Sequence, residues 1–141
     1  MSATLPGGRI FRDMTIHDFD AARWLFGEEV ETVQAAASVL TDPGIATLGD
    51  DDSVNVIRIT PSGKQCTITN TRRAIHGYDQ RIEVHGSTGS VAAENHREAN
   101  IQVANDKGHT RPPLPNFLLQ RYARASADEI AAFVAAVAEG K

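Results

Sequence analysis

Two short turns in the middle of the chain constrain its fold more than any other feature. Residues 53–60 and 64–70 are rich in β-favouring side chains, and only Pro61, Ser62 and Gly63 separate them, which is a hairpin signature. Residues 79–85 and 90–93 flank a second turn that contains glycine. Because strands joined by so few residues run antiparallel, the sequence predicts a mainly antiparallel sheet.

Helical patterns stand at both ends of this β-rich region. A helix is expected to begin near Asp13 and to end at Gly27, with one face made of Met14, His17, Ala21, Trp24 and Leu25. Residues 116–138 carry an apolar helical stripe. Ser126 either starts a second helix there or lies inside one long helix, and the pattern fits both.

Further strands are expected at residues 30–40 and 100–104, and residues 41–52 are expected to form a loop rich in aspartate, glycine and proline. The sequence therefore predicts an α+β fold: a mainly antiparallel sheet of about five to six strands, with an N-terminal and a C-terminal helix on one face.

Length and charge exclude several classes of protein. A chain of 141 residues fits a single domain, residues 1–141. The net charge of −4 and the scattered basic residues argue against nucleic-acid binding. No apolar run is long enough to span a membrane, and no signal peptide is recognised. Cys66 is the only cysteine, which favours a reducing, cytoplasmic location.

Asp13 and His17 form the most informative candidate site. Four residues apart on a helix, they would share one face. A carboxylate beside an imidazole orients the ring and suits proton transfer to or from a hydroxyl. Two other interpretations stay open: His17 as a buried structural residue, and Asp13 as a helix cap. No metal site is expected, because the five histidines are dispersed.

The segment from Gly7 to Trp24 reads Gly-Gly-x-x-Phe-x-Asp-Met-x-Ile-His-Asp-x-Asp-x-x-Arg-Trp. It resembles the helix that opens the C-terminal domain of the Gfo/Idh/MocA oxidoreductases, and within that family it is most similar to the inositol 2-dehydrogenases. Three later segments resemble the family in the same order, namely residues 70–81, the hairpin around residues 86–89, and residues 117–133.

The resemblance implies oxidation of a polyol such as myo-inositol, with NAD or NADP as the hydride acceptor. The family's catalytic residues fall on Asp13 and His17. His17 would take the hydroxyl proton, and Asp13 would orient it and help bind the polyol. Tyr78 falls where a tyrosine lines the substrate pocket, although it could equally be a turn residue packed on the sheet. His76 stands where the family sometimes has an aromatic residue.

Parts of the family pattern are missing from the chain. It has no G-x-G-x-x-G loop, and none of its lysines lies in the family's Glu-Lys-Pro motif. We therefore expect a C-terminal domain truncated at both ends, without the Rossmann domain, that binds no cofactor tightly and has no appreciable dehydrogenase activity alone. The alternatives are a non-catalytic sugar- or polyol-binding module and an oligomerisation module that forms a homo-oligomer through its sheet face.

Overall fold

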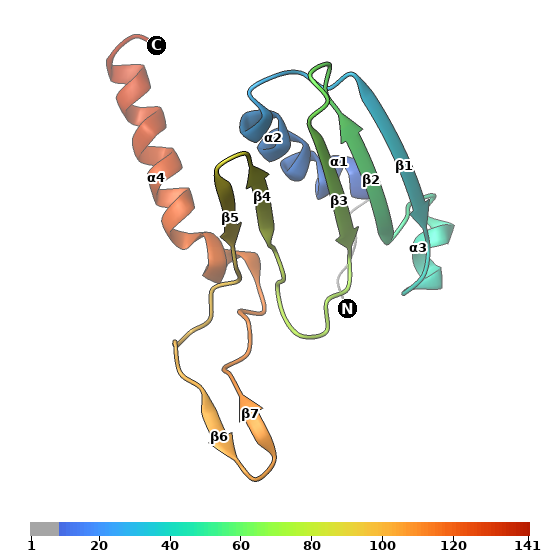
Figure 1. The fold of residues 1–141 in the computed structure, drawn as a ribbon, viewed down its shortest axis with the longest axis vertical. Helices are drawn as coiled ribbons and strands as arrows, with labels where there is room; N and C mark the ends of the chain where they lie inside the picture. Colours follow the sequence, from blue (N-terminus) through green and yellow to red (C-terminus); the bar gives the residue numbers. More distant parts are fainter. Residues whose placement is uncertain (1–8) are drawn as a thin grey trace. The chain divides into compact units, whose positions relative to one another are not determined.

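The computed structural model describes residues 9–141, which form helices and antiparallel strands (Figure 1). The expected α+β class is confirmed. The seven strands lie in three sheets of three, two and two strands rather than in one sheet of five to six. The chain divides into two compact units, one ending at Arg73 and one beginning at Ala74. No helix in residues 9–141 is long and apolar enough to cross a membrane.

The described part of the first unit, residues 9–73, contains three helices and one sheet. Its elements in chain order are α1 (Ile10–Asp13), α2 (Thr15–Phe26), β1 (Thr32–Ser38), α3 (Pro43–Thr47), β2 (Ser53–Ile59) and β3 (Gln65–Thr71). The strands are antiparallel in the order β1-β2-β3, and the predicted hairpin around Gly63 joins β2 to β3.

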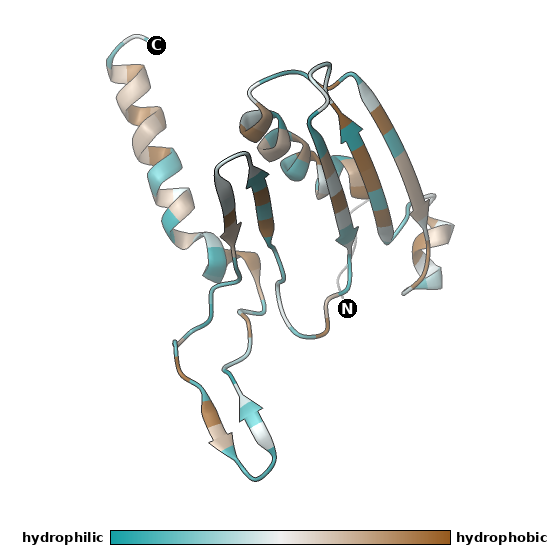
Figure 2. Ribbon diagram, in the orientation of Figure 1, coloured by the Kyte–Doolittle hydropathy of each residue, from teal (hydrophilic) through white to brown (hydrophobic). Residues whose placement is uncertain are grey.

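The core of this unit lies on the face of the sheet that contacts α2. Val54, Val56 and Arg58 of β2 are buried in alternation with more exposed residues, as expected for a strand with one covered face. Figure 2 shows the corresponding alternation of hydrophobic and hydrophilic bands along β2. Ile68 of β3 stands opposite Val56 and is also buried. Strand β1, at the sheet edge, is exposed along its whole length.

The predicted apolar face of the N-terminal helix is wrong. Thr15 and Ala22, seven residues apart, are the buried residues of α2, whereas Trp24 is 81% exposed and Leu25 is 41% exposed. The buried residues of α2 are thus small, and Arg58 of β2 contacts the helix at Phe19. The Arg58 guanidinium lies 4.8 Å from the centre of the Phe19 ring and donates to the Phe19 carbonyl at 2.9 Å.

The segment 41–52 contains a helix where a loop was expected. Asp42 caps α3 by accepting a hydrogen bond from Gly44 N at 2.8 Å, and Pro43 occupies the first turn, where a missing N–H costs nothing. The fully buried Asp52 closes the segment. Its carboxylate accepts from the backbone N–H groups of Leu40, Thr41 and Asp42 at 2.7–2.9 Å. Burial raises the pKa of Asp52, but these donors outweigh it and lower that pKa well below its ordinary value.

The second unit consists of two hairpins and one long helix. Its elements are β4 (Ile82–Gly86), β5 (Gly89–Ala93), β6 (Val103–Asn105), β7 (Gly108–Thr110) and α4 (Leu118–Ala138). The hairpin β4–β5 is confirmed, whereas β7 was not predicted. Helix α4 continues through Ser126, which decides the earlier alternative in favour of one long helix.

Candidate functional site

Asp13 and His17 lie on either side of a break between two helices. Asp13 is the last residue of α1, and His17 lies in the first turn of α2. Met14, between them, belongs to neither helix, although its φ of −111° and ψ of −63° stay in the right-handed helical region. The bend is closed by hydrogen bonds from Met14 N and the Thr15 hydroxyl to the Ile10 carbonyl, at 3.0 and 3.3 Å. The helix predicted to begin near Asp13 and to end at Gly27 is confirmed as α2, whose C-cap Gly27 has a left-handed φ of 67°, whereas the break at Met14 was not predicted.

Asp13 bonds to an arginine from the end of strand β3. Arg72 Nη1 lies 3.0 Å from Asp13 Oδ2, and Arg72 Nη2 lies 2.9 Å from Asp50 Oδ2. The second oxygen of Asp13, Oδ1, accepts no hydrogen bond from any group in residues 9–141, and the side chain is 55% exposed. Asp13 therefore presents an ion-paired carboxylate with one oxygen open to a ligand. It does not cap α2, which lacks a side-chain cap.

His17 is exposed, which excludes its interpretation as a buried structural residue. Within residues 9–141, no hydrogen bond or ion pair joins its ring to Asp13, which bonds Arg72 instead. The surrounding helix is held to the sheet on the opposite side. Asn70 of β3 donates to Asp18 Oδ2 at 2.8 Å, and Arg58 bonds the Phe19 carbonyl. Hydrogen bonds from the sheet therefore hold Asp18 and Phe19, next to His17, whereas the imidazole stays exposed.

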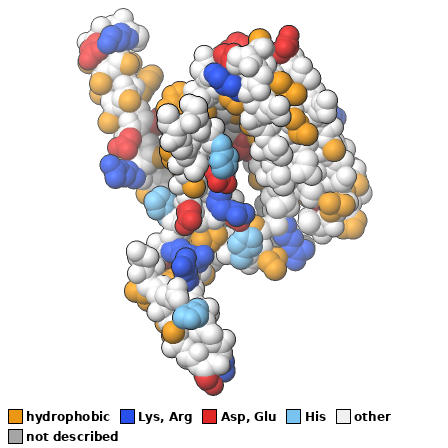
Figure 3. Space-filling model, in the orientation of Figure 1, with side chains coloured by type: hydrophobic (Ala, Val, Ile, Leu, Met, Phe, Trp, Pro, Cys, Tyr) orange, Lys and Arg blue, Asp and Glu red, His pale blue; other side chains and the backbone are white. Residues whose placement is uncertain are grey.

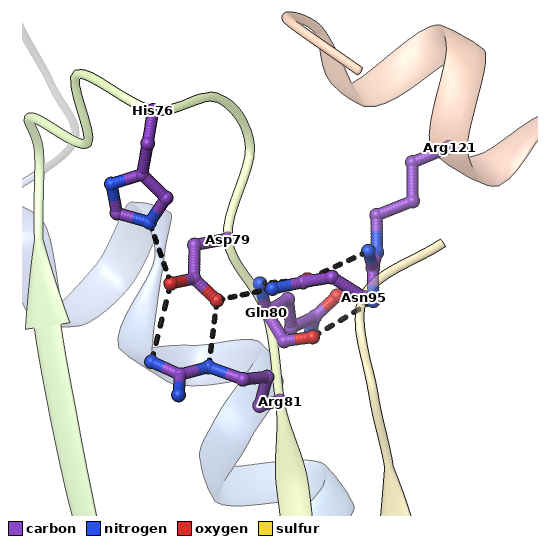
Figure 4. Close-up of polar contacts among 6 residues, drawn as sticks. All are labelled: His76, Asp79, Gln80, Arg81, Asn95 and Arg121. Carbon is purple, nitrogen blue, oxygen red and sulfur yellow. Dashed lines mark hydrogen bonds and ion pairs between the residues drawn. The ribbon is translucent and has the colours of Figure 1, made fainter. Parts of the chain in front are cut away.

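His76 and Tyr78 lie in the second unit, at the turn before β4. His76 Nε2 lies 2.8 Å from Asp79 Oδ2, as Figure 4 shows. Arg81 and Asn95 also donate to the Asp79 carboxylate, at 2.6–3.2 Å. The His76 and Asn95 hydrogen bonds, with Arg81, outweigh the effect of burial and lower the pKa of Asp79 to about 2. Asp79 thus holds the exposed His76 ring in one orientation.

Tyr78 is half-buried against helix α4. Its ring meets that of Tyr122 edge-on, with centroids 6.0 Å apart and an interplanar angle of 87°. The Tyr122 hydroxyl bonds the Gln80 side chain. Arg121, drawn with Gln80 in Figure 4, donates to the Gln80 carbonyl at 2.8 Å. Tyr78 therefore packs as an aromatic residue on a helix, and the prediction that it lines a substrate pocket stays a prediction.

Gly77, between the two, allows the turn to form. Its φ is +116°, and a Cβ atom there would lie 2.7 Å from Leu114 Cβ. Next to it, Tyr78 N donates to the Pro115 carbonyl at 2.8 Å. This contact positions both candidate side chains of the turn.

Sequence reasoning missed Arg72, Asp50 and Asp79. Arg72 and Asp13 are separated by 59 positions, so no local spacing could have joined them. The available signal was the resemblance of residues 70–81 to the family, a segment that contains both Arg72 and Asp79. Among the described residues, no group of three His, Cys, Asp or Glu side chains could hold a metal ion. A shallow hollow of the second unit is lined by polar and charged residues and Leu114, including His76, Asp79, Arg81 and Arg97.

The structure also bears on dinucleotide binding. Within residues 9–141, a strand leads into a helix at residues 39–42 and 111–117, and neither connection contains glycine. Gly86 and Gly89 instead bound the β4–β5 hairpin turn. The described residues thus do not offer the glycine-rich strand-to-helix loop that a nicotinamide dinucleotide requires.

Comparison with known proteins agrees with the first motif. Residues 1–92 match the family described as GFO/IDH/MocA C-terminal domain. The chain is 59% identical over 133 residues to inositol 2-dehydrogenase of Rhizobium meliloti, covering 94% of this chain and 40% of that protein. It is 45% identical over 134 residues to myo-inositol 2-dehydrogenase of Thermotoga maritima, covering 95% and 40% respectively.

A solved structure is similar along almost the whole chain. Scyllo-inositol dehydrogenase from Lactobacillus casei, with bound NAD(H) and scyllo-inositol, superposes with a TM-score of 0.86 at 27% identity. The match covers 98% of this chain and 41% of that one. The chain thus spans about 40% of the length of the relatives that it matches.

Proposed function

The chain belongs to the GFO/IDH/MocA C-terminal domain family, and on that premise we propose that it forms the polyol-binding side of an NAD(P)-dependent inositol dehydrogenase. The observation that carries the proposal is the bend between α1 and α2, where Asp13 and His17 are both exposed. A myo-inositol hydroxyl fits this chemistry, because it offers a proton to an imidazole and a hydrogen bond to a carboxylate.

The contacts of His17 and Asp13 suggest a different role for each residue. The His17 imidazole takes the proton of the hydroxyl that is oxidised, since no described group occupies it. Asp13 Oδ1 accepts a hydrogen bond from a polyol hydroxyl, while Arg72 holds Oδ2. A substrate-binding role for His76 and Tyr78 stays a separate prediction. In the complete enzyme the hydride acceptor, NAD or NADP, would be held by a separate domain, because residues 9–141 offer no glycine-rich loop from a strand into a helix.

A domain exchange tests this proposal. The matching 133 residues of the Rhizobium meliloti inositol 2-dehydrogenase are replaced by this chain, and NADH formation from myo-inositol is measured. We expect an active exchange enzyme, and no NADH formation by this chain alone. A folded exchange enzyme that oxidises no inositol would contradict the proposal.

A second measurement serves if the exchange enzyme does not fold. Ring signals of His17 and His76 in this chain are followed by NMR during titration with myo-inositol. Saturable shifts at His17 support the polyol site, and their absence counts against it. Binding without activity in a folded exchange enzyme would instead favour the non-catalytic polyol-binding module.

The face of the β1–β2–β3 sheet opposite α2 favours a further role, association between copies of the chain. In a chain with 23% charged residues, this face carries none, and Ile57 at its centre is 42% exposed. Loss of charge is typical of interface cores. Figure 3 shows few charged side chains over these strands. The face consists of Thr32, Gln34, Ala36, Ser38, Ser53, Asn55, Ile57, Ile59, Gln65, Thr67, Thr69 and Thr71.

We propose that homo-oligomers form through this uncharged face. Sedimentation velocity should show a dimer or larger species, and Ile57→Lys should shift it to monomer. Val33→Lys is the matched control, because Val33 is 55% exposed on the other side of the sheet. Monomer at every concentration, or equal effects of both variants, would exclude this face as the interface.

A further inference from the structure

Arg72 connects two carboxylates of the first unit through separate nitrogens. Its Nη1 bonds Asp13 Oδ2 at 3.0 Å, and its Nη2 bonds Asp50 Oδ2 at 2.9 Å. A planar guanidinium holds two such partners in fixed directions, which the rotating ammonium of a lysine does not. The backbone N–H of Arg72 donates to the Asp52 carbonyl at 2.8 Å, so the strand end itself is anchored.

Burial is unequal along this chain of charges. The side chains of Arg72 and Asp50 are 12% and 10% exposed, whereas that of Asp13 is 55% exposed. Burial raises the pKa of Asp50, but hydrogen bonds from Ile10 N and Asp51 N, and the Arg72 guanidinium, lower it below its ordinary value. Asp50 is therefore ionised at neutral pH and fixes Arg72 from the buried side.

The same two residues hold both ends of helix α1. Asp50 Oδ1 accepts from the backbone N–H of Ile10, the first residue of α1, at 2.8 Å. Arg72 bonds Asp13, the last residue. A four-residue helix is too short to be stable by itself. Its geometry, and the direction in which Asp13 points, thus depend on this clamp.

We propose that Arg72 is the positioning residue of Asp13, with Asp50 as its buried anchor. The inference rests on the proposed function and deepens it. Arg72 touches neither substrate nor reacting atoms. It keeps Asp13 Oδ2 occupied, so that Oδ1 faces the polyol, and it keeps α1 at the angle that brings Asp13 beside the first turn of α2.

Kinetics of the exchange enzyme test this role. Arg72→Met should lower kcat for myo-inositol by about 10- to 100-fold, the scale of a small misplacement of a group that orients the substrate. Arg72→Lys should recover part of the loss. Arg73→Met is the control, because Arg73 is exposed and its side chain bonds no other described residue. It should leave kcat unchanged.

A double-mutant cycle separates positioning from general loss of stability. If Arg72 acts through Asp13, Arg72→Met should cost less than about 3-fold once Asp13→Asn is present, because coupled residues are not additive. Equal losses in both backgrounds would overturn the proposal. So would a folded Arg72→Met enzyme with unchanged kcat.

Amide hydrogen exchange of this chain alone tests whether Arg72 stabilises α1, and it needs no measurement of enzyme activity. The amides of Arg12, Asp13 and Met14 close α1 by bonding Arg9 O and Ile10 O. Arg72→Met should make them exchange at least about 10-fold faster, and Arg73→Met should not. Unchanged exchange would overturn the inference even if the proposed function holds. If the exchange enzyme without further substitutions is inactive but Arg72→Met speeds exchange of the α1 amides in this chain, the result counts against the proposed function and supports the clamp.

Discussion

Replacing His17 with glutamine in the exchange enzyme should lower kcat for myo-inositol by about 10²- to 10⁴-fold, the usual contribution of a general base. Glutamine keeps a polar side chain but takes up no proton at neutral pH. Because the His17 side chain is exposed, the variant should retain the melting temperature of the parent. Steady-state NADH formation measures the loss.

His96→Gln is the matched control for this variant. His96 is also exposed and has no assigned role, so its replacement should leave kcat unchanged. Asp13→Asn should lower kcat by a smaller factor, about 10- to 100-fold, because Asp13 orients the polyol rather than moving the proton. Full activity of a folded His17→Gln enzyme would remove the imidazole from the mechanism.

Gly77→Ala should lower the free energy of unfolding of this chain by about 3 kcal/mol. The added methyl would meet Leu114 Cβ at 2.7 Å and the Leu114 carbonyl at 3.0 Å, in a backbone conformation that side chains rarely adopt. Both effects act between His76 and Tyr78, so the turn that carries them should shift. Urea unfolding followed by circular dichroism measures the loss.

Gly63→Ala separates the two causes. Gly63 also has a positive φ, +85°, but nothing lies within 4 Å of a Cβ atom there. Its replacement should cost only about 1 kcal/mol, the conformational part alone. Equal losses at both glycines would mean that the contact with Leu114 is not tight.

Local patterns predicted the parts of the fold that depend on near neighbours. The turns at Gly63 and at Gly86–Gly89 correctly predicted the two main hairpins, and the apolar stripe correctly predicted α4. Predictions that depended on distant contacts were wrong. The buried residues of α2 are Thr15 and Ala22, and its contact with Arg58, a residue of another element, could not be read from local spacing.

The candidate site divides in the same way. The first motif located Asp13 and His17 from sequence, and the resemblance supplied their proposed roles. Arg72 and Asp50 come from positions far along the chain, and only the folded sheet brings them to Asp13. Asp79 follows Tyr78 directly in the sequence. Its hydrogen bond to Asn95, however, joins residues 16 positions apart and could not be predicted from local spacing.

The most direct measurement is a crystal structure of the exchange enzyme with NAD and myo-inositol. The account predicts one ring hydroxyl within hydrogen-bonding distance of the His17 imidazole and another at Asp13 Oδ1, with Arg72 still on Oδ2. An inositol bound elsewhere, with neither Asp13 nor His17 in contact with it, would contradict the account.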